Sequence, residues 1–513
     1  MSWKTEVEGI EHRRHRATEL GGAEAVDKQH QRGRLTVRER IERLLDACSF
    51  REQGPIAGYS ETDDDGNLLT FTPANYVLGV GLIDGRACAV GGEDFTQRGG
   101  SPTPAGLRKS VYAEDLACRY RVPLVRFLEG GGGSVAGAGG KDRAPAGDPV
   151  YARARFASIG EAMASVPVVS AALGAVAGLP AARLVSSHFA LMVRDTAQVL
   201  IAGPAVVERA LGEHKSKQEL GGAEIHGHSG VVDNVCESEE QVFAEIRRFL
   251  GYLPSNVWEL PPRMEVDDDP GRQEEELLSI VPRDRRLVFD VRRLLELIVD
   301  RGSFFEMTPG LGPSQVTRLA PLSGQPVGVI ANDSRYYAGA MSAEGAQKVR
   351  RFVDLCDTFH LPIVSFVDEP GFMIGAAAEA AATIRHGAAA IFSVMQSSVP
   401  WASVHVRKAY GVAAAAHFGR DSFVLAWPSA EAGALPVEGG VAVAFHREIA
   451  AAEDPDARRR ELEEQFASAR SPFPRAEAFG VHDLIDPRRT RPMLCDWIEL
   501  AQPLLATQLH PRS

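Results

Sequence analysis

Two turns rich in small residues contain the residue types best suited to chemistry in this chain. The first, Gly174–Gly178, follows the apolar stretch Val166–Leu173 and leads into Leu179 and Pro180. A β-branched apolar stretch predicts a buried strand, and proline suits the first turn of a helix. A strand that turns tightly into a helix points backbone N–H groups outward, where they can hold an oxyanion. An ordinary buried strand–helix turn would look the same, so both interpretations stay open for this stretch alone.

The same arrangement occurs a second time near the other end of the chain. Val399–Gly419 begins with a Val-Pro apolar strand, has Gly411 at the turn and continues into alanines that predict a helix. Similarity extends upstream in matching pairs, Arg121–Gly130 with His360–Gly371 and Val37–Phe50 with Val291–Phe304. A repeat of about 240 residues is far too long for a solenoid. It predicts two copies of one domain, and two oxyanion turns imply two carbonyl substrates that exchange a group.

Strand and helix signals alternate in both halves, which predicts an α/β fold. The elements that must position the first turn are a helix over 103–121 and a strand from Pro123 to Leu128; helix 343–359 and strand 362–367 match them. We expect a first domain over 1–256, an acidic, proline-rich linker over 257–280 and a second domain over 281–513.

Composition excludes several classes of protein. The 513 residues are 44% apolar with a net charge of −12, which allows two full cores and argues against a general nucleic-acid binder. The six cysteines form no CxxC pair, so neither a zinc ribbon nor a redox dithiol is expected. The N-terminus lacks the apolar stretch of a secretory signal, and no apolar run reaches ~18 residues. We therefore expect a cytoplasmic protein without a membrane span.

Other candidate residues remain ambiguous. The glycine-rich loop after Glu129 fits neither GxGxxG nor GxxxxGK[ST]; it either lets backbone approach a ligand or is a flexible surface loop. Glu129 and Asp368 end matching strands, where they are catalytic carboxylates or, as we favour, structural caps. His226 and His228 lack a clear third metal ligand, so we favour local hydrogen bonding and expect no bound metal. Neither a GxSxG elbow nor an HExxH motif occurs.

An ordered series of motifs gives the chain a resemblance to a known family. The motifs are Leu35–Ile41, Glu219–Ala223 with His226 and Ser229-Gly230, Tyr252–Asn256, Pro326–Val329, Val367–Phe372, Ile384–Ala388, Arg407–Gly411 and Ala426–Pro428. Over nearly its whole length, the chain resembles the carboxyltransferase (β) subunits of biotin-dependent acyl-CoA carboxylases, which are ligases. The propionyl-CoA and methylcrotonyl-CoA enzymes are examples.

The resemblance implies tandem crotonase-like ββα-spiral domains, related by internal duplication, in a hexameric ring. Acyl-CoA would lie on the first half and carboxybiotin on the second, with each active site between two subunits. The backbone N–H groups of Gly178 and Leu179 would hold the thioester enolate, and those of Val412 and Ala413 the biotin ureido oxygen. The residues expected to contact CoA or biotin are Gly131, Gly132, Gly133, Ser134, Tyr410, Gly411 and Ala415. In the family the biotin takes the α-proton itself, which accounts for the lack of a legible protein base.

Several positions depart from the family pattern. Ala177–Pro180 replaces Ala-Gly-Gly-Ala, so the N–H of Leu179 survives while Pro180 has none. Gly411–Ala414 replaces Gly-Gly-Ala-Tyr, and Glu129–Ser134 replaces Asp-Ser-Gly-Gly-Ala-Arg. Small side chains at Ala414 and at Ala415, a specificity position in the family, leave room for a different acyl chain.

The leading prediction is an acyl-CoA carboxyltransferase subunit. None of the eight lysines lies in a Met-Lys-Met motif, so the biotin is expected on a separate biotin carboxylase or carboxyl carrier protein. The first alternative is a decarboxylase or transcarboxylase that acts on a malonyl-type CoA thioester. The second is a non-catalytic paralogue with a structural role.

Overall fold

The computed structural model describes residues 2–132, 155–468 and 471–509 of the chain. It divides into two compact units, Met1–Glu259 and Leu260–Ser513. None of the helices in these described ranges is long and apolar enough to cross a membrane.

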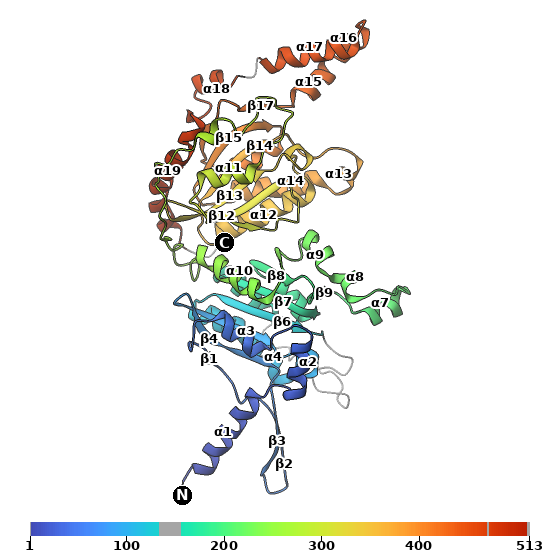
Figure 1. The fold of residues 1–513 in the computed structure, drawn as a ribbon, viewed down its shortest axis with the longest axis vertical. Helices are drawn as coiled ribbons and strands as arrows, with labels where there is room; N and C mark the ends of the chain where they lie inside the picture. The colour runs from blue at the N-terminus through green and yellow to red at the C-terminus, as the bar shows by residue number, and fades with distance from the viewer. Residues whose placement is uncertain (1, 133–154, 469–470, 510–513) are drawn as a thin grey trace. The chain divides into compact units, whose positions relative to one another are not determined.

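The first unit is built on an eight-stranded sheet with the order β1-β4-β5-β6-β7-β8-β10, and β9 pairs with the far end of β7 (Figure 1). β1, β4 and β5 are antiparallel, and the pairs from β5 onward are parallel. A separate hairpin pairs β2 with β3. The strands are β1 Arg51–Glu52, β2 Gly58–Thr62, β3 Leu68–Pro73, β4 Tyr76–Ile83, β5 Arg86–Glu93, β6 Leu124–Gly130, β7 Val168–Ala177, β8 Phe189–Val193, β9 Gln198–Leu200 and β10 Asn234–Cys236.

The second unit repeats this sheet strand for strand. Its order is β11-β12-β13-β14-β15-β16-β18, and β17 pairs with the far end of β15. The strands are β11 Phe305–Met307, β12 Gln315–Leu322, β13 Gln325–Asn332, β14 Ile363–Glu369, β15 Trp401–Tyr410, β16 Phe423–Ala426, β17 Glu431–Gly433 and β18 Asp483–Leu484. The repeated order confirms the predicted α/β class and the internal duplication.

Helices cover both faces of the first sheet. α4 and α5 pack on one face around Leu124, while α3 and α10 cover the other, where Phe127 meets Phe243 edge to face. Leu124 and Phe127 are an odd number of residues apart, so they point to opposite faces of β6. The helices of this unit are α1 Lys4–Thr18, α2 Ala23–Gln31, α3 Val37–Leu44, η1 Arg98–Gly100, α4 Pro104–Tyr120, α5 Arg155–Ser165, α6 Leu179–Val185, α7 Pro204–Leu211, α8 Lys217–Gly221, α9 Ala223–Ser229 and α10 Glu239–Tyr252.

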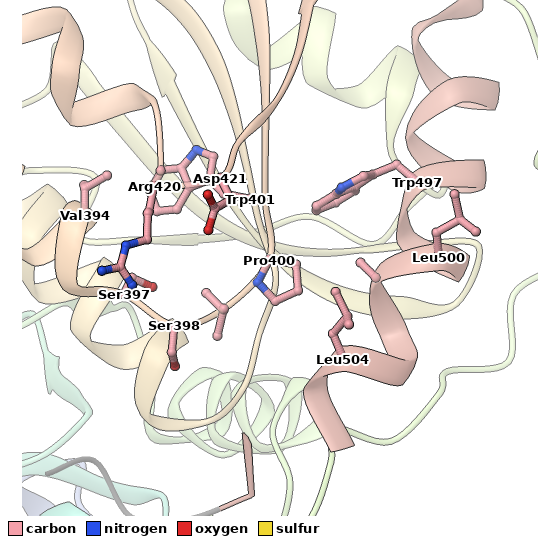
Figure 2. Close-up of a pocket in the computed structure, with 13 residues that line it drawn as sticks. Val394, Ser397, Ser398, Pro400, Trp401, Arg420, Asp421, Trp497, Leu500 and Leu504 are labelled. Carbon is pink, nitrogen blue, oxygen red and sulfur yellow. The ribbon is translucent and has the colours of Figure 1, made fainter. Parts of the chain in front are cut away.

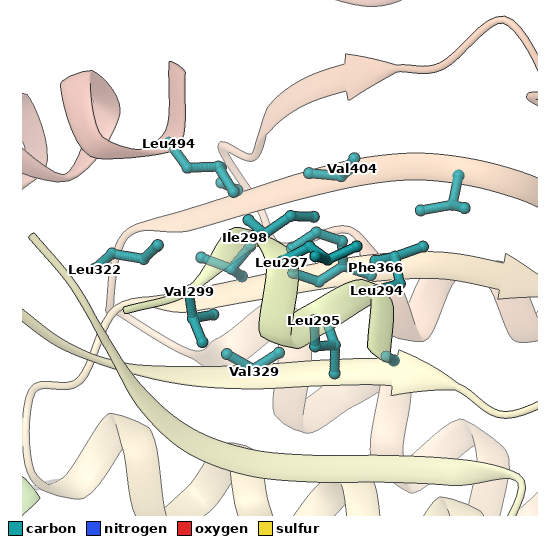
Figure 3. Packing of buried hydrophobic residues seen from close by; sticks show 14 of the residues in the cluster. Leu294, Leu295, Leu297, Ile298, Val299, Leu322, Val329, Phe366, Val404 and Leu494 are labelled. Atoms are coloured by element: carbon teal, nitrogen blue, oxygen red, sulfur yellow. The ribbon is translucent and has the colours of Figure 1, made fainter. Parts of the chain in front are cut away.

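The second unit has the same layers. α12 and α14 pack together, with α12 against β12 and β13, and an extensive apolar core lies under α11 and α19 (Figure 3). Leu294, Ile298 and Leu494 from these helices meet Phe366 and Val404 from the sheet. The helices are η2 Glu275–Leu278, α11 Val291–Ile298, η3 Tyr337–Gly339, α12 Ala343–Thr358, α13 Ala376–Ala380, α14 Thr383–Gln396, η4 Ala413–His417, α15 Val437–Ala444, α16 His446–Ala451, α17 Pro455–Ser468, α18 Phe473–Glu477, η5 Pro487–Arg489, α19 Thr490–Leu505 and η6 Ala506–Gln508.

Two local predictions around the turns were wrong. Gly174–Ala177, expected as a turn, belongs to β7, because β9 extends the pairing of that strand beyond its contact with β8. Gly174 is needed there for space, since a Cβ would lie 2.4 Å from the Glu129 carboxylate. The alanines after Gly411 form only the short 3₁₀-helix η4 rather than a full helix.

Residues 260–280 of the expected linker belong to the second unit. Met264 N–H donates to the carbonyl of Gly324 (2.7 Å), and Arg272 pairs with Asp268 (2.7 Å). The buried Arg491 of α19 donates to the carbonyl of Asp269 at 2.9 Å. These contacts hold the segment against the β12–β13 turn and against α19.

A groove of about 430 Å³ opens between α19 and the start of β15 (Figure 2). Trp401 and Pro400 form its floor beside Trp497, Leu500 and Leu504 of α19. At the equivalent place in the first unit, the chain that follows α10 contacts the end of α5, where Val257 N–H donates to the carbonyl of Ser165 (3.0 Å). The groove lies at the opposite end of β15 from Gly411, so it is separate from the candidate site.

Candidate functional site

The first candidate turn lies where β7 ends and α6 begins. Gly178 has φ 66° and ψ −128°, a conformation that favours glycine, and a Cβ there would lie 2.8 Å from the Cα of Gly132. The backbone of Gly132 therefore packs against the turn, and Gly131 N–H donates to the carbonyl of Gly99 (3.3 Å). Leu179 is the first residue of α6, so its N–H has no partner within the helix. The predicted residues Gly133 and Ser134 lie outside the described residues.

The second candidate turn has the same place in the second unit. β15 ends at Tyr410, Gly411 has φ 63°, and its N–H donates to the carbonyl of Gly433 (3.1 Å). Val412 follows with helical φ and ψ and a side chain that is 65% exposed. The N–H of Ala415 donates to the carbonyl of Val412 (3.1 Å), whereas the N–H groups of Val412 and Ala413 precede this first helical bond. Two backbone donors are thus free of bonds within the helix at this strand end.

The side chain of Tyr410 supports this turn from the interior of the unit. Its side chain is buried, and its hydroxyl donates to Glu431 at 2.7 Å, which ties β15 to β17. Both turns can therefore present backbone donors to an oxyanion, each at the end of the same strand of a duplicated sheet.

The carboxylate of Glu129 is fully buried and fully paired. It meets Arg40 at 2.6 Å and Arg34 at 2.9 Å, and accepts a hydrogen bond from Gln29 at 2.8 Å. Arg40 continues to Glu239 at 2.7 Å, so the network joins α3, β6 and α10. These contacts favour the structural interpretation of Glu129.

Asp368 has the equivalent role in the second unit. Its carboxylate pairs with Arg407 at 2.7 and 3.0 Å and accepts from the N–H of Lys408 at 3.1 Å. The guanidinium of Arg407 also lies over the ring of Phe289. Asp368 therefore joins β14 to β15 and, like Glu129, is better explained as a structural carboxylate.

A buried polar group behind the second turn was missed by the sequence analysis. His417, the last residue of η4, contacts Ser365 Oγ through Nδ1 (2.9 Å) and Glu369 Oε2 through Nε2 (3.3 Å). A serine, histidine and carboxylate in a row resemble a hydrolase triad, but all three side chains are completely buried and out of reach of a substrate. The main-chain oxygen of His417 accepts from Trp401 and Ser403, so the group anchors η4 and the turn.

A charged cluster lies behind the first turn and was also missed. Glu114 pairs with Arg126 (3.1 Å) and with Arg183 of α6 (2.8 Å), and all three are buried. Arg126 also donates to the carbonyls of Arg183 and Ser186 at 2.8 and 2.7 Å, which satisfies the C-terminal end of α6. The guanidinium groups of Arg126 and Arg183 thus share the Glu114 carboxylate next to α6, the helix that follows the turn.

Glu93, at the end of β5, lies on the other side of this cluster. It lines a cavity of about 20 Å³ together with Leu179, Pro180 and Arg183, which leaves room for a single water molecule. Burial raises the pKa of Glu93 to about 7, and the positive charge of Arg183 only partly opposes this. The main-chain N–H of Glu129 donates to its carboxyl group at 3.3 Å.

His226 of the candidate pair makes structural hydrogen bonds. His226 contacts the carbonyl of Val199 through Nε2 (2.8 Å) and the hydroxyl of Ser229 through Nδ1 (3.0 Å), as favoured from the sequence. Within the described ranges, no three His, Cys, Asp or Glu side chains are grouped to hold a metal ion.

Comparison with known proteins gives matches along almost the whole chain. Residues 28–507 match the family described as carboxyl transferase domain. The carboxyltransferase subunit of propionyl-CoA carboxylase from Haloferax mediterranei is 36% identical over 502 residues, covering 96% of this chain and 95% of that protein. Methylmalonyl-CoA decarboxylase subunit alpha from Veillonella parvula is 33% identical over 480 residues, covering 92% and 91%.

Solved structures agree with these matches. The transcarboxylase 12S subunit, determined as a hexamer with methylmalonyl-CoA and methylmalonic acid bound, superimposes with a TM-score of 0.86 at 31% identity. The superposition covers 100% of this chain and 96% of that one. It confirms the tandem crotonase-like, ββα-spiral fold expected from the resemblance.

Proposed function

Because the chain belongs to the carboxyl transferase domain family, we propose that it moves a carboxyl group between carboxybiotin and a CoA thioester. The observation that supports this most directly is the duplicated turn: Gly178 and Gly411 directly follow equivalent strands with φ 66° and 63°, and each precedes backbone donors at the start of a helix. A reaction between two carbonyl compounds needs one such turn for each substrate.

The first unit would bind the acyl-CoA. The N–H groups of Gly178 and Leu179 would hold the thioester oxygen while the α-carbon carries negative charge as an enolate. A well-placed donor to such an oxyanion contributes about 3–4 kcal/mol to transition-state stabilisation. Gly131 and Gly132 would let the CoA approach the backbone, and we extend this role to Gly133 and Ser134 from the resemblance alone.

The second unit would receive carboxybiotin from a separate biotin carboxylase or carboxyl carrier protein. Bound biotin supplies the carboxyl group and an acceptor for the substrate α-proton. The residues fit such a group: Val412 is exposed, Ala413, Ala414 and Ala415 are small, and Gly411 brings the backbone to the surface of the turn. The N–H groups of Val412 and Ala413 would hold the ureido oxygen, with Tyr410 supporting the turn from beneath.

We extend the proposal to assembly as a homohexamer with active sites shared between subunits. The support is the 12S relative, which was solved as a hexamer assembly. Ligase activity of the complete complex would then depend on the biotin-bearing partner, while this chain performs the carboxyl transfer.

A decarboxylase is the second candidate. Its support is the 33% identity to methylmalonyl-CoA decarboxylase subunit alpha over 92% of this chain. A non-catalytic structural subunit is the third candidate, motivated by the loss of one donor at Pro180.

One assay separates these candidates without the unidentified partner. Purified chain is incubated with methylmalonyl-CoA or malonyl-CoA, with and without free biotin, and the decarboxylated CoA ester is measured by chromatography. Product that requires biotin supports carboxyl transfer. Product of equal amount without biotin would indicate a decarboxylase, and an inert chain with all CoA esters would favour the structural role.

A further inference from the structure

The duplication places two different side chains at the same strand end. β5 ends at Glu93, and the equivalent strand β13 ends at Asn332. Each accepts a hydrogen bond from the main chain of the next strand: Glu129 N–H donates to Glu93 at 3.3 Å, and Asp368 N–H donates to Asn332 at 2.9 Å. A neutral amide thus makes this bond in the second unit, so the bond does not require the charge of a carboxylate.

The surroundings of Glu93 have an unbalanced charge. The charged and titratable groups that face it are Arg183 on α6, Arg126 on β6, Glu114 on α4 and Tyr76 on β4. Arg126 and Arg183 both pair with Glu114, which leaves one positive charge in excess. Burial keeps the Tyr76 phenol protonated, since it raises the pKa of Tyr76 well above its usual value.

The other nearby acids are already engaged. The Glu129 carboxylate is paired with two arginines, and Asp94 accepts hydrogen bonds from Thr96 and Gln97. Within the cluster of Arg126, Arg183, Glu114 and Glu93, the net charge then changes with the ionisation of Glu93. It is about +1 when Glu93 is neutral and about 0 when Glu93 is ionised.

The cavity connects this charge to the turn. Glu93 lines the water-sized cavity together with Leu179 and Pro180, the residues that begin α6. Glu93 is buried behind the turn, where a change of one charge is screened less than it would be in water.

We propose that Glu93 sets the charge behind the turn at Leu179, and that its neutral form supports the enolate of the CoA thioester held there. The inference rests on the proposed function and names a positioning residue for it: Glu93 acts through the field at the turn without touching the reacting atoms.

The charges of the cluster determine whether ionisation of Glu93 helps or hinders enolate formation. When Glu93 is neutral, the excess positive charge of the arginines favours the negative enolate oxygen. When Glu93 ionises, that excess disappears and enolate formation becomes harder. Because burial raises the pKa of Glu93 to about 7, the change falls near neutral pH.

The test compares wild type with Glu93→Gln, which keeps the size of the side chain, and Glu93→Asn, which copies the second unit. Biotin-dependent carboxyl transfer from methylmalonyl-CoA is measured from about pH 5.5 to about pH 9. We expect kcat of the wild type to fall about tenfold as pH rises through neutrality, while kcat of both variants stays near the low-pH value. Glu39→Gln serves as the control, because the Glu39 carboxylate bonds to Thr36 and His30 rather than to the cluster, and the variant should keep the wild-type pH profile.

Three outcomes overturn the inference. Parallel pH profiles of wild type and both variants would show that Glu93 does not control the charge. Loss of activity in both variants at every pH, with CoA ester binding retained, would show that the carboxyl group itself is required. A wild-type protein that is inactive with every CoA ester would reject the proposed function, and the inference would fall with it. An active wild-type protein with either of the first two outcomes would reject the inference and leave the proposed function standing.

Discussion

The raised pKa of the buried Glu93 carboxyl group predicts how the stability of the protein changes with pH. Its pKa is about 7 in the folded protein and 4.5 in its unperturbed state. The folded chain therefore holds a proton that the unfolded chain has released between these two values. Stability then decreases with rising pH across this window, because the native state binds more protons than the unfolded state.

The size of the effect follows from the shift in pKa. Each pKa unit corresponds to about 1.4 kcal/mol, so a shift from 4.5 to about 7 costs about 3 kcal/mol above neutral pH and nothing below about pH 4. Glu93 is only 6% exposed, so solvent screens little of this cost. In Glu93→Gln the titration is absent, and the variant should gain about 3 kcal/mol relative to wild type between these pH values.

Urea unfolding at equal protein concentration measures this difference at pH 4, 5, 6, 7 and 8. The quantity of interest is the difference in midpoint between Glu93→Gln and wild type, since a chain of two units need not unfold in one step. Glu39→Gln is the matched control. Partial burial acts to raise the pKa of Glu39, but hydrogen bonds to Thr36 and His30 outweigh it and lower that pKa, so loss of this carboxylate should destabilise the protein more at neutral than at acidic pH. A difference between Glu93→Gln and wild type that stays constant with pH would refute the reasoning.

Three further predictions concern the turns and the core. Val412→Pro removes one backbone donor at a residue whose φ of −70° already suits proline, and should lower kcat of carboxyl transfer about 100-fold, whereas Val412→Ala keeps the donor and most of the activity. Glu129→Gln removes the buried carboxylate that Arg40 shares with Arg34, so that only Glu239 balances Arg40, and should destabilise the protein by about 3–5 kcal/mol in urea unfolding; an effect below about 1 kcal/mol would contradict the buried network. Thr36→Ala removes the capping box of α3 and should cost about 1 kcal/mol, measured in the same way, with unchanged kcat.

Local patterns in the sequence were sufficient for the architecture. Strands and helices recur in the same order on both sides of residue 260, and each side ends a long apolar strand at a glycine followed by a turn. Such signals lie within short stretches of chain, because hydrophobic periodicity and turn residues act locally. Local patterns therefore indicate the two turns, and the family resemblance adds Gly178, Leu179, Val412 and Ala413 as the candidate donors.

The end of β7 was mispredicted because it depends on a strand that is distant in the sequence. The small residues at Gly174–Ala177 are typical of a turn, yet pairing with β9 continues the strand to the glycine that follows. That pairing joins residues more than 20 positions apart in the chain, so no local pattern contains it. The space required by Glu129 at Gly174 likewise appears only once the two strands are side by side.

Charge in the interior was decided entirely by tertiary structure. Arg40 and Glu129 are 89 residues apart, His417 and Glu369 are 48 apart, and Arg183 and Glu114 are 69 apart. The sequence left both a catalytic and a structural role open for Glu129, and its arginine partners favour the structural one. The sequence by itself determined the duplicated scaffold and its two turns, because these depend on neighbouring residues. Which carboxyl groups are paired and which, like Glu93, keep a proton depends on burial and on distant partners, and only the folded chain brings these together.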